Sequence, residues 1–180
     1  MGKRLPLSIQ ILNLQDIADH YNDIETALKY YYDSIISGQN KSIPEKFFSY
    51  SKEELYEERN KRIEELDKTS SLTLLASLEA RFKIDYKNRG ERKVKDDLSR
   101  EFRKIYKQHA EHVSLINILE LWKKHEPDKK KLISDFIGAL NYRHWLAHGR
   151  YYDPKLGRKY DFADIYFLAI DLHNTLSLII

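Results

Sequence analysis

The 180-residue chain contains no cysteine. This absence excludes disulfide bonds, thiolate nucleophiles and every zinc site that uses cysteine, and it favours an intracellular, cytoplasmic protein. Glycine and proline are also scarce, with six and four residues, and no glycine-rich phosphate-binding loop occurs. The sequence therefore offers neither thiol chemistry nor a P-loop.

The chain also lacks a large excess of charge and a membrane-spanning apolar run. Its formal net charge is only +3, so nucleic-acid binding would require a local basic patch. The N-terminus has no apolar segment followed by a small-residue cleavage site, so we expect no signal peptide. Residues 162–180 are long enough to span a bilayer but include Asp164, Asp171 and His173, which favours a buried helix and no membrane association.

Apolar residues instead recur at helical spacing along most of the chain. Residues 17–35 are preceded by Asn13 and followed by Gly38, typical start and stop signals of a helix. Further helices are expected over residues 52–68, 69–88, 93–124 (as one helix or two), 127–148 and from 162 onward. Ser51 with Glu54 forms a capping-box pattern before residues 52–68, and Ser114 is a start signal within 93–124. A turn between two tyrosine-rich arms makes residues 150–161 a candidate for a short hairpin.

These patterns predict an all-α bundle of about five to seven helices. We expect one domain over residues 1–180. Within it, residues 38–68 would form a connection and a highly charged peripheral helix. Residues 127–180 would form a helix carrying the most unusual polar cluster, a basic loop and the C-terminal helix.

That polar cluster closes the helix predicted over residues 127–148. The apolar stripe of this helix runs through Ile133, Phe136, Ile137 and Leu140. At about 100° per residue, the same stripe continues through Arg143, His144 and His148, so we expect these side chains on the buried face. A guanidinium there must be paired, or face a cleft or a second subunit. Gly149 ends the helix and leaves His148 at the negative end of the helix dipole.

The hexapeptide RHWLAH, from Arg143 to His148, resembles the Arg-x4-His motif of the HEPN superfamily. Many HEPN proteins are metal-independent ribonucleases that act as toxins of toxin–antitoxin systems or in antiviral defence. The resemblance implies RNA as substrate, no cofactor, and a homodimer in which the two motifs form one composite site. It also implies an antitoxin or another defence protein as a further partner. Position 150 is arginine, whereas HEPN toxins silenced by a nucleotidyltransferase carry a modifiable tyrosine there, so we do not expect regulation by adenylylation.

The residue types suit this chemistry. Cleavage of RNA without a metal requires activation of the 2′-hydroxyl, protonation of the leaving 5′-oxygen and neutralisation of the developing charge. His148 can exchange a proton near neutral pH, Arg143 can grip two phosphate oxygens, and His144 can position either. The products would be a 2′,3′-cyclic phosphate and a 5′-hydroxyl.

Other residues are expected to support these three. Glu79 is the predicted ion-pair partner of Arg143, and Asn141 is a further supporting residue. A local basic and aromatic surface for RNA is predicted from Arg150, Tyr151, Tyr152, Lys155, Arg158 and Lys159.

Two other interpretations of the cluster remain open. The chain could be a non-catalytic helical module that binds a nucleotide, RNA or a partner protein, or Arg143 could serve only in a structural pair with Glu79. His144 and His148 have the i, i+4 spacing of zinc ligands. The segment lacks the glutamate of the HExxH motif and no third ligand is evident, so no metal is expected.

Overall fold

The computed structural model describes residues 12–40, 42–154 and 156–180. These residues form six α-helices and no strand, which confirms the predicted all-α fold. The helices are α1 (Leu14–Ile36), α2 (Lys52–Glu91), α3 (Asp97–His109), α4 (Leu115–His125), α5 (Lys130–Ala147) and α6 (Phe162–Thr175). Short 3₁₀ helices at Glu45–Phe47 (η1) and Pro127–Lys129 (η2) precede α2 and α5.

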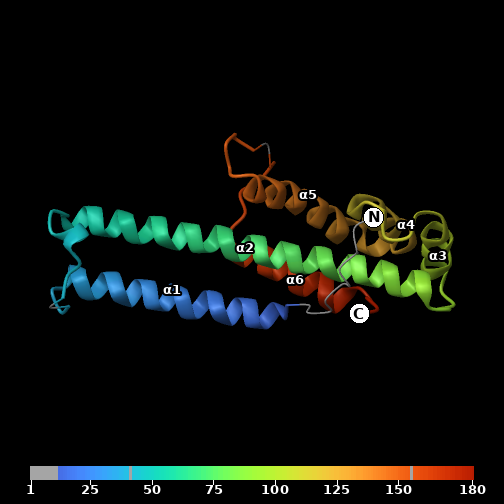
Figure 1. Ribbon diagram of the computed structural model, residues 1–180, viewed down its shortest axis with the longest axis horizontal. Helices are drawn as coiled ribbons and strands as arrows, with labels where there is room; N and C mark the ends of the chain where they lie inside the picture. Colours follow the sequence, from blue (N-terminus) through green and yellow to red (C-terminus); the bar gives the residue numbers. More distant parts are fainter. Residues whose placement is uncertain (1–11, 41, 155) are drawn as a thin grey trace, which may run out of the picture.

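Helix α2 is the axis of the molecule. This helix has 40 residues, is about 60 Å long and runs from one end of the molecule to the other (Figure 1). It contacts each of the other five α-helices. Ser51 and Glu54 start it with a reciprocal capping box, as the sequence predicts. The separate helices expected over 52–68 and 69–88 form one continuous helix. At the expected break, the Thr69 hydroxyl donates to the carbonyls of Glu65 and Leu66 in the preceding turn, so the helix continues through this residue. The charged segment is therefore the first half of the central helix.

Two hydrophobic cores lie along α2. The larger core surrounds its second half, where the Phe82 ring stacks on Phe136 at a centroid distance of 5.4 Å and meets Trp122 edge-on at 6.3 Å. The smaller core consists of Tyr32, Ile35, Phe47 and Leu55 and joins α1 to the start of α2. The α1–α2 end of the molecule thus has a core of its own.

A buried ion pair ties the C-terminal segment to α2. Asp85 is fully buried and accepts bonds from Arg89 Nε at 2.7 Å, Trp122 Nε1 at 3.2 Å and the Ile179 amide at 2.7 Å. Arg89 in turn donates to the carbonyl of Ser177. Burial raises the pKa of Asp85, and these donors act against that rise.

Helices α3 and α4 are separate, which settles whether residues 93–124 form one helix or two. The chain turns at Ala110, whose φ of 48° is outside the helical region. Helix α4 starts after Ser114, which accepts a bond from the Asn117 amide at 3.2 Å and acts as the predicted N-cap.

The candidate hairpin at residues 150–161 is absent from the described part of that segment. Trp145 Nε1 donates to the carbonyl of Tyr152 at 2.7 Å, and the Tyr160 ring stacks on Tyr142 at 5.3 Å. The loop therefore folds against α5 instead of pairing with itself, and it projects from the body of the molecule (Figure 1). Asp161 and Asp164 then start α6 with a second capping box.

Across the described ranges, no helix has the length and apolar character needed to cross a membrane. The C-terminal helix predicted from residue 162 ends at Thr175. It packs one face, which includes Ile165, Ala169 and Leu172, into the larger core.

Candidate functional site at the end of helix α5

The buried face of α5 rotates around the helix toward its C-terminus. Its buried residues are Ile133, Phe136, Ala139 and Tyr142, spaced by three rather than alternately by three and four. A spacing of three lags behind the helical repeat of about 3.6 residues, so the inward face turns steadily. The half-buried Trp145 continues this face where the 150–161 loop folds back onto α5.

The rotation overturns one prediction about the motif. His144 and His148 are exposed, and Arg143 is half-buried, so the cluster does not lie on the buried face of a single chain. The prediction assumed that the same face of the helix stays buried along its whole length. Tyr142, stacked on Tyr160, occupies the inward position instead.

Arg143 is anchored to the central helix. Its Nη2 lies 3.3 Å from Glu79 Oε2, and the two side chains are 33% and 30% exposed, so the predicted partner is present. The Nε atom of Arg143 is buried and has no hydrogen-bond partner among the residues that the structure describes. One edge of the guanidinium is thus held by α2, while part of the group remains accessible to a ligand.

The two histidines of the motif lie one helical turn apart with their rings in contact. Their centroids are 4.2 Å apart and the ring planes are inclined by 48°. The His148 amide donates to the carbonyl of His144 at 3.1 Å as the last bond of the helix. Both imidazoles face solvent on the projecting end of α5, where each can exchange protons with a bound molecule.

Arg150 is not an unpaired cation of the loop. It forms a bidentate ion pair with Glu65 of α2, at 2.6 and 2.8 Å, and this bond lowers the pKa of Glu65. The pair joins the loop to the first half of α2 across 85 positions of sequence. Arg150 therefore anchors the loop, and its charge is largely compensated in the single chain.

The other residues predicted to contact RNA differ in availability. Tyr151 is 82% exposed and Tyr152 is 40% exposed, with their rings edge to face at 5.1 Å. Arg158 lies over the Tyr160 ring at 4.5 Å, and Lys159 is exposed. Lys155 lies outside the described residues. Asn141 is exposed on α5, one turn before Trp145.

A group of hydroxyl and carboxyl side chains lies beneath this end of α5 and was missed by the sequence analysis. Tyr21 donates to Asp67 at 2.6 Å, and burial, together with the nearby Asp161, raises the pKa of Asp67. Burial and the nearby Asp67 also raise the pKa of Tyr142 to about 12. No sequence signal indicated this cluster, because its members come from α1, α2, α5 and the start of α6.

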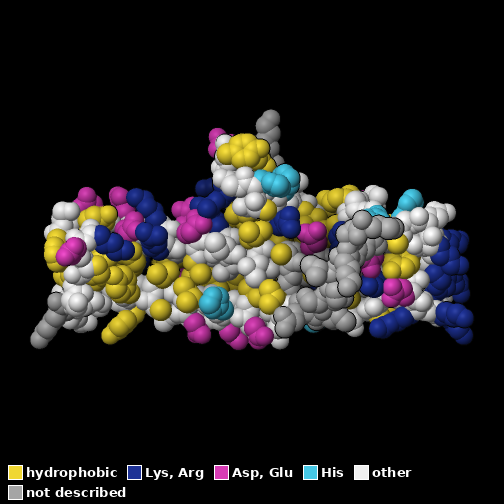
Figure 2. Space-filling view, in the orientation of Figure 1, with side chains coloured by type: hydrophobic (Ala, Val, Ile, Leu, Met, Phe, Trp, Pro, Cys, Tyr) yellow, Lys and Arg dark blue, Asp and Glu magenta, His cyan; other side chains and the backbone are white. Residues whose placement is uncertain are grey.

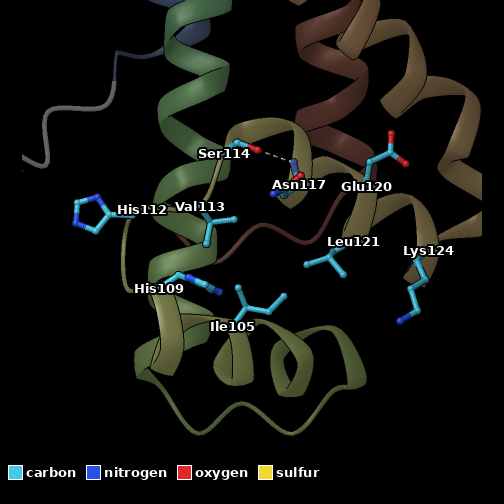
Figure 3. Close-up of a pocket in the computed structure, with 9 residues that line it drawn as sticks. All are labelled: Ile105, His109, His112, Val113, Ser114, Asn117, Glu120, Leu121 and Lys124. Carbon is cyan, nitrogen blue, oxygen red and sulfur yellow. Dashed lines mark hydrogen bonds between the residues drawn. The ribbon is translucent and has the colours of Figure 1, made fainter.

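A surface hollow of about 660 Å³ lies elsewhere, between α3 and α4 (Figure 3). Ile105, Val113 and Leu121 form its apolar wall, and His109 and His112 lie at its edge, at the junction of the two helices. Lys124 at the rim is held by both oxygens of Glu101. None of the predicted site residues lines this hollow.

Within the described ranges, no group of three or more His, Asp or Glu residues is placed to hold a metal ion. Comparison of the chain with protein-family models, curated proteins and solved structures found no match. The chemistry of the residues at the end of α5 is therefore the basis for a functional hypothesis.

Proposed function

We propose that this protein is a metal-independent endoribonuclease that acts as a homodimer, with His148 as the acid or base and Arg143 as the phosphate clamp. The observation that carries the proposal is the exposed His148 ring, in contact with His144, at the end of the helix that also carries Arg143, which Glu79 holds in place. Side chains with these chemistries in the last turns of one helix supply a proton carrier and a permanent cation to the same end of the helix.

A second copy would complete the site. In one chain the two imidazoles lie on a projecting, solvent-exposed end, where water screens their interactions with a substrate. Two copies related by a two-fold axis through this end would bring two histidine pairs and two guanidiniums together and exclude water between them. The accessible part of Arg143 would then face phosphate.

In the proposed reaction one His148 removes the proton of a ribose 2′-hydroxyl. The 2′-oxygen bonds to the adjacent phosphorus, and the bond from phosphorus to the 5′-oxygen breaks. The His148 of the second copy protonates that 5′-oxygen, and Arg143 compensates the charge on the non-bridging oxygens. The products are a 2′,3′-cyclic phosphate and a 5′-hydroxyl, with no net oxidation and no added cofactor.

The biological setting that we propose is a toxin–antitoxin or antiviral defence system in the cytoplasm. This part of the proposal is supported by the resemblance of RHWLAH to the HEPN motif. An antitoxin or another defence protein would then be a physiological partner.

The direct test is to incubate the purified chain with RNA in EDTA and to identify the ends of the products. We expect cleavage that His148→Ala abolishes and that His20→Ala, which removes an exposed histidine on α1, leaves intact. Cleavage that stops with chelator, or that survives His148→Ala, contradicts the proposal.

Arg143→Lys separates the clamp from a structural role. Lysine keeps the charge and the ion pair with Glu79 but loses bidentate contact with phosphate. The proposal expects a large loss of cleavage with an unchanged melting temperature. RNA binding without any cleavage by the wild type would favour the non-catalytic module. A lower melting temperature with unchanged activity would assign Arg143 a structural role only.

A further inference from the structure

The positive charge of this chain is concentrated at the end of the molecule opposite the α1–α2 connection. Residues 87–107 contain nine Lys or Arg and four Asp or Glu, a net charge of +5, whereas the whole chain has +3. The remainder therefore has a net charge of −2. Figure 2 shows Lys and Arg side chains gathered where Figure 1 places α3 and the end of α2.

Most cations of this end lack a compensating carboxylate. Arg92, Lys93, Lys95, Lys104 and Lys107 are exposed, and none has an ion pair within the part of the chain that the structure describes. Their charges are available to a ligand.

Two carboxylates of the same segment are held by cations outside the exposed five, while Glu91 accepts from the Tyr106 hydroxyl. Asp96 binds Arg89 and caps α3 through the Ser99 amide, and Glu101 binds Lys124 and His125. The hydrogen bond from Lys124, the larger effect, and the one from His125 lower the pKa of Glu101. These acids compensate other cations, so they do little to reduce the field of the five exposed ones.

The backbone that carries the exposed cations is held in place. Arg103 donates to the carbonyls of Arg92 at 3.0 Å and of Val94 at 2.7 Å, which locks the α2–α3 turn against α3. On α3, Lys104 and Lys107 share a face with Arg100, which pairs with its neighbour Asp97. The three are separated by rises of about 6 and 4.5 Å along the axis. A row of cations with this regular spacing suits a ligand whose negative charges also recur.

Residues 87–107 have no exposed large apolar side chain that could insert into a membrane. The exposed large hydrophobic residues nearest in the described sequence are Tyr56 and Ile116, and neither lies within 87–107. Membrane-surface helices bury an apolar face, and readers of unpaired bases use exposed aromatic rings. A ligand on the exposed face of this segment would therefore be held by charge.

We infer that this surface binds the phosphodiester backbone of a nucleic acid, which is RNA if the proposed function holds. The basic end is defined as Arg92, Lys93, Lys95, Arg100, Lys104 and Lys107. Contacts are with phosphates and are independent of base sequence. The basic end is separate from the loop at 150–159, where Arg150 is already paired with Glu65.

The test compares two triple variants of the full chain that each lower the net charge from +3 to 0. One removes Lys95, Lys104 and Lys107, each to Ala, and the control removes the exposed Lys52, Lys61 and Lys130, each to Ala. Binding of a fluorescent single-stranded RNA is measured by anisotropy across a salt series, in the His148→Ala background so that the RNA stays intact.

We expect the basic-end variant to bind about tenfold or more weakly, and its slope of log K against log salt to fall by about 2, since each lost phosphate contact contributes about 0.7. The control should bind within about twofold of the parent. Equal weakening of both variants, or of neither, overturns the inference.

A second arm addresses anionic membranes. Sedimentation with phosphatidylserine-containing vesicles should leave the protein in the supernatant, and binding to vesicles without binding to RNA also overturns the inference. RNA binding through the basic end by a protein that never cleaves RNA would refute the proposed function and leave the inference standing. Cleavage of RNA by a basic-end variant that binds RNA as tightly as the parent would refute the inference and leave the proposed function standing.

Discussion

Two arginines of the motif region end in ion pairs with the same helix. Arg143 pairs with Glu79 and Arg150 with Glu65, both on α2. The first pair could be predicted, because Glu79 lies beside the apolar stripe that includes Leu75 and Phe82. The second could not, because it joins a loop to a segment whose charged sequence gave no sign that it lies under that loop.

The buried Asp85 is the residue on which we expect stability to depend most. Asp85→Ala would remove the closer of the two carboxylates that pair with Arg89, leaving Asp96, and would leave the donors Trp122 Nε1 and Ile179 N without an acceptor. We expect a loss of about 3–5 kcal/mol in the free energy of unfolding, measured with urea. Asp97→Ala, which breaks an exposed pair with Arg100, should cost under about 1 kcal/mol. Similar losses in the two variants would contradict the role of burial.

Asp67 should make stability depend on pH in the direction opposite to a surface carboxylate. Burial raises the pKa of Asp67 above its ordinary value, so the folded state holds a proton that the unfolded state releases first. The stability of the wild type relative to Asp67→Asn should therefore be greatest at low pH and fall as the pH rises above about 4. Unfolding curves of both proteins between acidic and neutral pH would test this. A wild type that becomes more stable relative to Asp67→Asn as the pH rises would refute it.

At the scale of elements, local capping signals predicted helix starts well. Asn13, Ser51 and Ser114 each cap the helix that the sequence placed after them. Periodicity failed where a helix changes partners along its length. The first half of α2 packs on α1 around the smaller core, whereas the second half lies in the larger core with residues of α1, α3, α4, α5 and α6, so the apolar patterns of the two halves differ. The end of α5 turns its inward face toward its own loop.

The close packing of α3 on α2 depends on Gly90. A Cβ atom there would lie 2.5 Å from Cγ of Tyr106, so Gly90→Ala must displace the ring or the helix. We expect a loss of about 1–3 kcal/mol by thermal or urea unfolding. The loss should shrink in a Tyr106→Ala background, and a purely additive double variant would exclude the contact as the cause.

The small core at the α1–α2 end should open independently of the rest. Phe47→Ala removes a buried ring packed against Tyr32 at 5.7 Å, a change of about 3–5 kcal/mol in such a core. Hydrogen exchange should accelerate at amides near Leu55 and leave those near Phe82 unchanged. Uniform acceleration along α2 would mean that both cores unfold as one unit.

At the scale of the whole molecule, the proposed composite site makes a prediction about mixtures. The proposed reaction uses the His148 of both copies, so a dimer of one wild-type and one His148→Ala chain should be inactive. We expect RNA cleavage to fall below the wild-type share of the mixture after wild-type chains and an excess of His148→Ala chains are unfolded together and refolded. Activity in proportion to the wild-type share would favour a site contained in one chain.

Because α2 is continuous, it also fixes how far the basic end lies from Arg143. Glu79, which holds Arg143, and Arg92 are thirteen positions apart, or about 20 Å at about 1.5 Å of rise per residue. A stacked strand advances about 3.4 Å per nucleotide, so about six nucleotides bridge this interval. The helix would then act as a ruler: very short oligonucleotides could occupy either place but not both, and susceptibility to cutting would rise sharply with substrate length.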